Sequence, residues 1–123
     1  MGYRSEVAFK CTPEAHNILL AVADFEPTLK EMLKECENVE VFGGEFQDPD
    51  MKPNTPGAYF WSHTKWYETY KEISTFETVM QLLENMGLEQ EFGFIRIGEE
   101  LDDYEMRGDS SAHNMYIHRS IEL

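Results

Sequence analysis

The chain has 123 residues, a length that fits one domain built around a single hydrophobic core. Hydrophobic residues make up 41% of it and aromatic residues 13%, which is too much apolar material for a disordered protein. The 24 Asp and Glu residues against 10 Lys and Arg give a formal net charge of -14, which repels phosphate backbones and anionic membrane surfaces. The composition therefore argues against direct nucleic-acid or membrane binding, and it favours either plain solubility or a basic partner.

The N-terminal part of the chain predicts a strand followed by a helix in two segments. Residues 4–11 alternate between apolar and polar side chains, as in a half-buried strand. Thr12, Pro13 and Glu14 then supply an N-cap, a proline at the first helical position and an acid in the first turn. Pro27 cannot lie inside a helix, so we expect a break before it and a second segment after it. The expected inward-facing residues of the two segments are Ala15, Ile18, Leu19, Val22, Leu29, Met32, Leu33 and Cys36.

The middle of the chain predicts two strands separated by a long loop. Residues 39–42 read as a short strand, and residues 46–57 contain three prolines and read as a loop. Residues 58–67 predict an aromatic-rich strand. Because aromatic side chains fall on both of its faces, we expect this strand to be central in the sheet.

The C-terminal half predicts one helix and further strands. Apolar residues at helical spacing up to Leu83 predict an amphipathic helix that ends at Gly87. Residues 92–97 predict a strand and residues 114–123 another, while residues 103–107 suit a short edge strand before a turn.

The element order is βαββαβ with an added C-terminal strand, which predicts an α+β fold. This is the order of a ferredoxin-like split βαβ sandwich, in which an antiparallel sheet carries its helices on one face. We expect the other face of the sheet to be partly open. The sequence shows neither a repeat nor a linker, so residues 1–123 are expected to form a single domain.

The cysteines and the N-terminus predict a cytoplasmic protein. Cys11 and Cys36 lack the CxxC spacing of redox or metal sites, and we interpret both as small buried hydrophobic residues, with a disulfide as the alternative. The N-terminus lacks the apolar region of a signal peptide, and no run approaches the roughly 20 apolar residues of a membrane span.

No catalytic or metal-binding signature emerges from the sequence. The four histidines lack zinc-ligand spacing, and the acidic loop at residues 48–54 lacks the central glycine of a calcium loop. Ser110, Ser111 and His113 lie in a polar turn without a GxSxG motif. We therefore expect no cofactor, no metal ion and no catalytic residue, and the chain favours a non-enzymatic protein.

A block of carboxylates directly follows the strand at residues 92–97. So many like charges close together are tolerated if they are solvated, bind a cation or face a basic partner, and the sequence does not choose among these. Strand alternation sends neighbouring acids to opposite faces, which disfavours a shared cation site. We expect this block to form the partner-binding surface, with the residues Glu99, Glu100, Asp102, Asp103, Glu105 and Asp109.

Four segments resemble a family of small, acidic, uncharacterised bacteriophage and prophage proteins. They are residues 2–9 (GYRSEVAF), 65–68 (KWYE), 92–103 (FGFIRIGEELDD) and 118–121 (HRSI). The resemblance carries no established activity and no catalytic residues. It implies a phage origin, a setting in the cytoplasm of an infected bacterium, and a role as an accessory protein that binds a host or defence protein, such as an inhibitor of a nucleic-acid-binding complex.

Two other functions remain open from the sequence. One is a small-molecule or metal-dependent enzyme that uses the open sheet face, because His and Arg on central strands are seldom left without a partner. The pocket expected for it contains Tyr59, Trp61, His63, Arg96 and His118. The other is a structural component of an oligomer, since the sequence leaves the oligomeric state undetermined.

Overall fold

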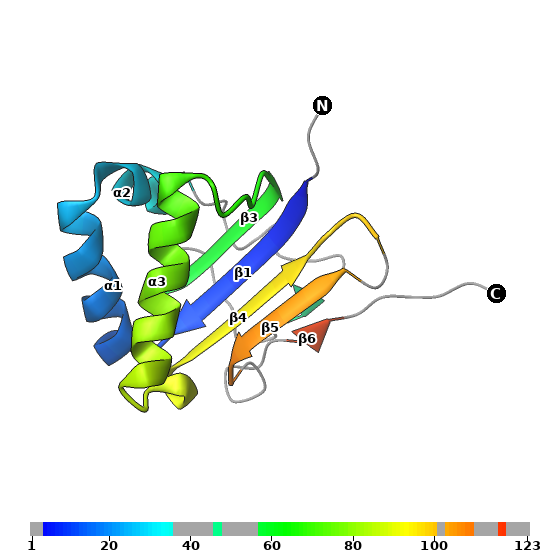
Figure 1. Ribbon diagram of the computed structural model, residues 1–123. Coiled ribbons are helices and arrows are strands. Elements are labelled where there is room, and N and C mark those ends of the chain that lie inside the picture. Colours follow the sequence, from blue (N-terminus) through cyan, green and yellow to red (C-terminus); the bar gives the residue numbers. More distant parts are fainter. Residues whose placement is uncertain (1–3, 36–45, 48–56, 101–102, 110–115, 118–123) are drawn as a thin grey trace.

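A four-stranded antiparallel sheet forms the centre of the protein. The computed structural model describes residues 4–35, 46–47, 57–100, 103–109 and 116–117. The sheet contains β1 (Ser5–Cys11), β3 (Ala58–Thr64), β4 (Phe92–Ile97) and β5 (Tyr104–Gly108), in the spatial order β3-β1-β4-β5. Figure 1 shows β5 at the rim of the sheet, next to β4. Only the two inner strands, β1 and β4, have a described neighbour on each side.

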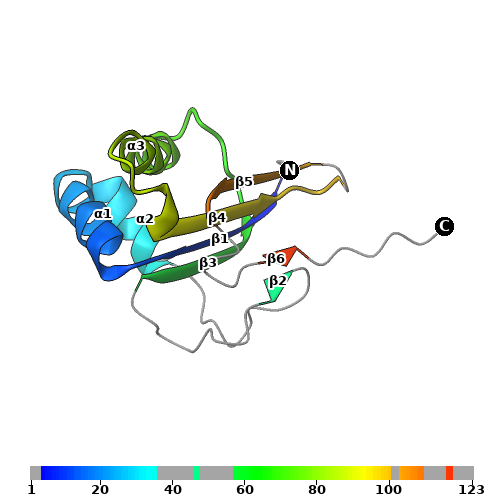
Figure 2. The same cartoon turned by 90° about the horizontal axis from the view of Figure 1, so that it is seen from below.

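Three helices cover one face of this sheet. They are α1 (Pro13–Phe25), α2 (Pro27–Lys34) and α3 (Lys71–Asn85). A short 3-10 turn, η2 (Glu89–Glu91), leads into β4. The two-residue strands β2 (Phe46–Gln47) and β6 (Tyr116–Ile117) pair with each other, and Figure 2 shows them on the side of the sheet opposite to the helices. No helix in the described part of the chain is long and apolar enough to cross a membrane.

The main core lies between the sheet and the helices and is rich in aromatic rings. Phe9 of β1 is fully buried at its centre, with its ring centroid 4.9 Å from that of Phe76 on α3 and 5.8 Å from that of Phe92 on β4. The edge-to-face geometry of the first pair is a favourable one for aromatic rings. Alternation along the strands explains this packing, because every second residue of β1 and β4 points to the helices.

The helix boundaries follow from local chemistry. Pro13 and Pro27 occupy first-turn positions of α1 and α2, as expected. Thr12 is the N-cap residue of α1, but its hydroxyl donates to the Glu91 carboxylate (3.1 Å) instead of capping the helix. At the end of α3, Gly87 adopts a positive φ of 74° and its N–H donates to the Glu84 carbonyl, so it ends the helix as predicted.

The α+β class, the antiparallel sheet and the helices on one face agree with the sequence, but the ferredoxin-like topology is not confirmed. The connection β3–α3–β4 encloses β1 between its two strands, as a split βαβ unit does. The expected strand at residues 39–42 lies outside the described residues. β5 extends the sheet beyond β4, so the order and number of strands differ from expectation.

Two further expectations about strands are corrected. β3 lies at one end of the four-stranded sheet, so the description of it as central was wrong for the sheet as described. Of the expected C-terminal strand at residues 114–123, the structure describes only β6, which belongs to the small second sheet and not to the four-stranded one.

The second sheet face, away from the helices, is open only in part. Ala8, Phe60, Ile95 and Ile97 form a separate buried cluster there, each 3% exposed or less. On the same face, the side chains of Tyr104 and Met106 of β5 remain exposed.

Candidate interaction surface

The acidic block lies in the turn between β4 and β5. The Gly98 N–H donates to the Asp103 carbonyl (2.8 Å), and the Asp103 N–H donates to the Glu100 carbonyl (3.1 Å), which closes the turn. Glu99 and Glu100 are exposed, and a Glu99 carboxylate oxygen accepts from the Arg4 backbone N–H (2.6 Å). The sheet thus holds these two acids on a defined turn at the surface.

The next two acids of the block bind Arg96. The Arg96 guanidinium reaches both carboxylate oxygens of Asp103, at 2.8 and 3.4 Å, and a Glu105 oxygen at 3.5 Å. It also donates to the Ser5 hydroxyl (3.2 Å). The Arg96 side chain is 17% exposed, and its hydrogen bond to Asp103 is the main reason why its pKa is raised. Asp103 and Glu105 are therefore partly structural residues.

A second ionic cluster joins β5 to α3. Arg107 donates to Glu77 (2.5 Å) and to Glu84 (2.7 Å), and the Trp66 indole N–H donates to the other oxygen of Glu77 (3.1 Å). Only 16% of the Arg107 side chain and 20% of Glu77 are exposed. Burial outweighs the Trp66 hydrogen bond and the Arg107 charge, so the pKa of Glu77 is raised.

The register of β5 explains why these charges meet. Met106 lies opposite Ile95 of β4 and Glu105 opposite Arg96. Because neighbouring residues of a strand point to opposite faces, Glu105 and Arg107 face the helices, while Tyr104 and Met106 face the other side. The alternation was visible in the sequence, but the strand's own partner was not.

A hollow of about 570 Å³ opens beside the Arg96 cluster, near the segment that connects β3 to the start of α3. Its walls include Trp66, Tyr67 and Glu68 together with Arg96 and its carboxylate partners. The arginine is held by its neighbours, so the hollow presents mainly carboxylate oxygens and aromatic rings.

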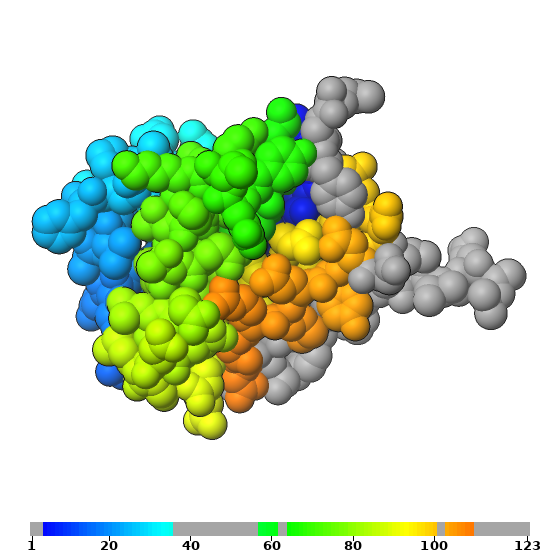
Figure 3. Space-filling model, in the orientation of Figure 1, coloured from blue at the N-terminus to red at the C-terminus, as the bar shows by residue number. Residues whose placement is uncertain are grey.

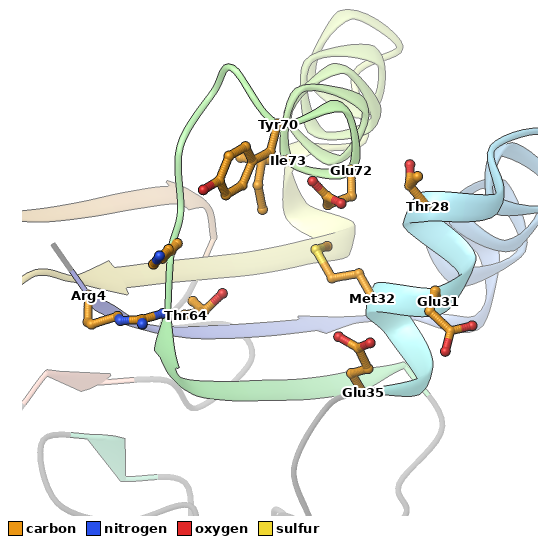
Figure 4. Close-up of a pocket in the computed structure, with 10 residues that line it drawn as sticks. Arg4, Thr28, Glu31, Met32, Glu35, Thr64, Tyr70, Glu72 and Ile73 are labelled. Carbon is orange, nitrogen blue, oxygen red and sulfur yellow. The ribbon is translucent and has the colours of Figure 1, made fainter. Parts of the chain in front are cut away.

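A second hollow, of about 580 Å³, lies between α2, the beginning of α3 and the end of β3 (Figure 4). Glu31 and Glu35 approach it from α2 and Glu72 from α3, with Arg4 on the opposite side. Met32 and Ile73 contribute apolar surface. This hollow combines charges of both signs, and it contains none of the residues that the sequence analysis assigned to a pocket.

Three of the residues expected to form an enzyme pocket, Tyr59, Trp61 and Arg96, lie in the described part of the chain with their side chains. Trp61 is 5% exposed and its indole N–H donates to the Met32 carbonyl (3.0 Å). The Tyr59 hydroxyl lies 2.7 Å from His16 Nε2, and partial burial lowers the pKa of His16. Arg96 lies across β1 from Trp61, because both are opposite Val7.

These three residues face the helices rather than the open side of the sheet. The side chain of His63 and all of His118 and Asp102 lie outside the described residues. Asp109 is half-buried, and its backbone N–H donates to the Phe92 carbonyl (2.8 Å) at the end of β5.

Cys11 is a free, buried cysteine, and burial raises its pKa to about 12. Its thiol therefore stays protonated at neutral pH and is a packing residue. Cys36 lies outside the described residues. In the part of the chain that the structure describes, no group of three or more His, Cys, Asp or Glu residues is placed to hold a metal ion.

Comparison with models of known protein families, with curated proteins and with solved structures found no match.

The raised pKa of Glu77 predicts a pH-dependent stability. The folded protein holds a proton on Glu77 more tightly than the unfolded chain does. The free energy of unfolding therefore falls as the pH rises from 4.5, the ordinary pKa of a glutamate, through the raised pKa of Glu77 in the folded protein. Gln does not titrate, so we expect the difference in free energy of unfolding, Glu77→Gln minus wild type, to increase across that pH interval. At higher pH this difference should stay constant. Urea titrations at successive pH values test this, with the exposed Glu89→Gln as control. A constant difference at every pH would contradict it.

Proposed function

We propose that this protein is a non-enzymatic binding module whose acidic surface engages a basic surface of another protein. The observation that carries the proposal is the exposed position of Glu99 and Glu100 directly after β4, in the connection to the paired strand β5. A charged group that is already held in place loses little conformational entropy on binding, so it recognises a partner efficiently.

The pattern of internal ion pairs supports the proposal. Arg96 and Arg107, on the two strands that the turn connects, face the helices, and each contacts two carboxylates. The positive charge of these two arginines is therefore neutralised by carboxylates of the protein itself. The net charge of -14 then dominates the electrostatic field that an approaching protein meets.

The resemblance to small acidic phage proteins suggests the partner. On this proposal the protein acts in the cytoplasm of an infected bacterium, where it binds a host or defence protein with a basic surface. Proteins that bind nucleic acids have such surfaces, so inhibition of a nucleic-acid-binding complex is the proposed consequence.

A salt-dependent capture experiment tests the proposal. The immobilised protein is incubated with bacterial lysate at low and at moderate salt, and retained proteins are identified. We expect a basic protein that is retained at low salt and lost as salt screens the charges. The absence of any salt-sensitive partner would overturn the proposal.

Variants of the turn locate the surface. The double variant Glu99→Gln/Glu100→Gln should keep its fold, because exposed acids contribute little to stability. It should bind the captured partner more weakly, by about tenfold, mainly through slower association. Surface plasmon resonance at low salt measures both rates.

The double variant Glu31→Gln/Glu35→Gln is the matched control. It removes the same number of exposed carboxylates, but from α2. Equal losses in both variants would show that only the total charge matters, and a larger loss in the control would move the surface to α2.

A further inference from the structure

The outer edge of β5 carries backbone groups that no strand of the described sheet uses. The Gly98 N–H donates to the Asp103 carbonyl and the Asp109 N–H donates to the Phe92 carbonyl, so residues 103 and 109 point their backbone groups at β4. The pairing with β4 is continuous between them. Since backbone groups alternate in direction along an antiparallel strand, Tyr104 and Met106 point theirs away from β4.

The side chains at this edge are exposed and apolar. Tyr104 is 56% exposed and Met106 is 48% exposed, and both lie on the sheet face away from the helices. Figure 3, seen from the helix side, shows that the helices leave the orange atoms of β5 uncovered at the rim of the sheet. An exposed edge with apolar side chains is a template for pairing with another strand, and proteins usually block such edges.

The sequence of β5 is complementary to itself. If two copies pair antiparallel about a two-fold axis at Met106, the outward N–H and carbonyl of Met106 meet the same groups of the second copy. Glu105 then lies opposite Arg107 of the second copy, and Arg107 opposite its Glu105. Both side chains keep their partners within their own copy, so this register chiefly avoids like charges directly across the strand pair.

The other face of the same pairing is also complementary. Tyr104 lies opposite Gly108 of the second copy, where the glycine leaves room for the ring, an arrangement that stabilises glycine in a strand. The two Met106 side chains meet at the axis. Both exposed residues of the edge would then be covered.

From this geometry we propose that the protein forms a symmetric dimer in which the β5 strands pair and the two sheets join into one of eight strands. The inference is independent of the proposed function. The paired strands are short and both copies are strongly negative, so the dimer is weak at low salt and is strengthened by salt, which screens the repulsion. Binding of a basic partner responds to salt in the opposite direction.

Sedimentation equilibrium tests the dimer. Because small interfaces bind weakly, the protein is studied up to about 1 mM, at low salt and at roughly 0.5 M salt. We expect the mass to rise from the monomer value of 14.4 kDa towards twice that value, and to rise further at high salt. A monomer under all of these conditions overturns the proposal.

Two lysine variants assign the surface. Met106→Lys places two like charges together at the axis and should abolish the dimer, while Met86→Lys makes the same change at a methionine of similar exposure, 54%, beyond the end of α3. Circular dichroism verifies that both fold. Equal dimerisation of the two variants overturns the assignment to β5.

Cross-linking provides a second readout that does not depend on the lysine variants. Residues paired at such a position have Cα atoms about 5.5 Å apart, within the range that a disulfide spans. In a Cys36→Ser background, Met106→Cys should form a disulfide-linked dimer with an added thiol oxidant at least tenfold faster than Met86→Cys. Equal rates would exclude the two-fold axis at Met106.

Discussion

Replacing Gly108 by alanine is expected to lower the free energy of unfolding by about 3 kcal/mol or more, because two costs add up. Gly108 adopts a φ of 71°, a region that costs an L-residue roughly 1–2 kcal/mol. An added Cβ would also lie 2.3 Å from the Phe92 carbonyl oxygen, a distance that requires the backbone to move. That oxygen accepts the hydrogen bond from Asp109 that ends β5, so the change pushes β5 away from β4.

Gly87→Ala is the matched control for this prediction. Gly87 has a nearly identical φ of 74°, but nothing lies within 4 Å of an added Cβ. It should therefore cost only the conformational strain, about 1–2 kcal/mol. Urea unfolding of both variants separates the two costs, and equal losses would contradict the close approach of β5 to Phe92.

Replacing Arg107 by alanine is expected to cost about 2–4 kcal/mol at neutral pH. The change leaves Glu77 and Glu84 without their shared counter-charge, and an unpaired carboxylate at a mostly buried position is expensive. This loss is set somewhat lower than the loss expected when one partner of a fully buried ion pair is removed, because Glu84 is 31% exposed. Thermal and urea unfolding measure the loss.

Lys30→Ala removes a cation from an exposed pair and is the control, since Lys30 and Asp24 are 54% and 68% exposed. It should cost less than about 1 kcal/mol. Adding Glu77→Gln to Arg107→Ala should recover part of the loss, because the second change removes the stranded charge. A loss no larger than that of Lys30→Ala would show that the Arg107 cluster does not hold β5 against α3.

The helices and most strands could be predicted because their signals are local. Pro27 and Gly87 mark helix boundaries through their own backbone geometry, and alternation marks β4 and β5. The order of the strands could not be predicted, because pairing joins residues far apart in the sequence. Neither the position of β5 next to β4 nor the position of β3 at the rim followed from the sequence.

The candidate site shows the same division between local and distant signals. The sequence predicts that an acidic segment follows β4, but not which of its acids are exposed and which bind Arg96. The pairing of Arg96 with Asp103 depends on the register of β4 and β5, which was not known. Alternation along the strand predicted for residues 58–67 would place Trp66 on the face opposite to Trp61. Because β3 ends at Thr64, alternation no longer applies, and the Trp66 ring packs in the main core with its centroid 5.7 Å from that of Phe94.

The place of β1 in the sheet has a consequence for how the chain folds. This strand comes first in the sequence, yet both of its neighbours, β3 and β4, come after residue 57. Its pairing therefore closes long loops, and proteins with a high contact order of this kind fold slowly compared with helical proteins of equal size. During synthesis on a ribosome, β1 remains without its second neighbour until residue 97 has been added. The helices can form early, but the part of the sheet that holds the acidic turn in place is completed only after β4 and β5 have been added.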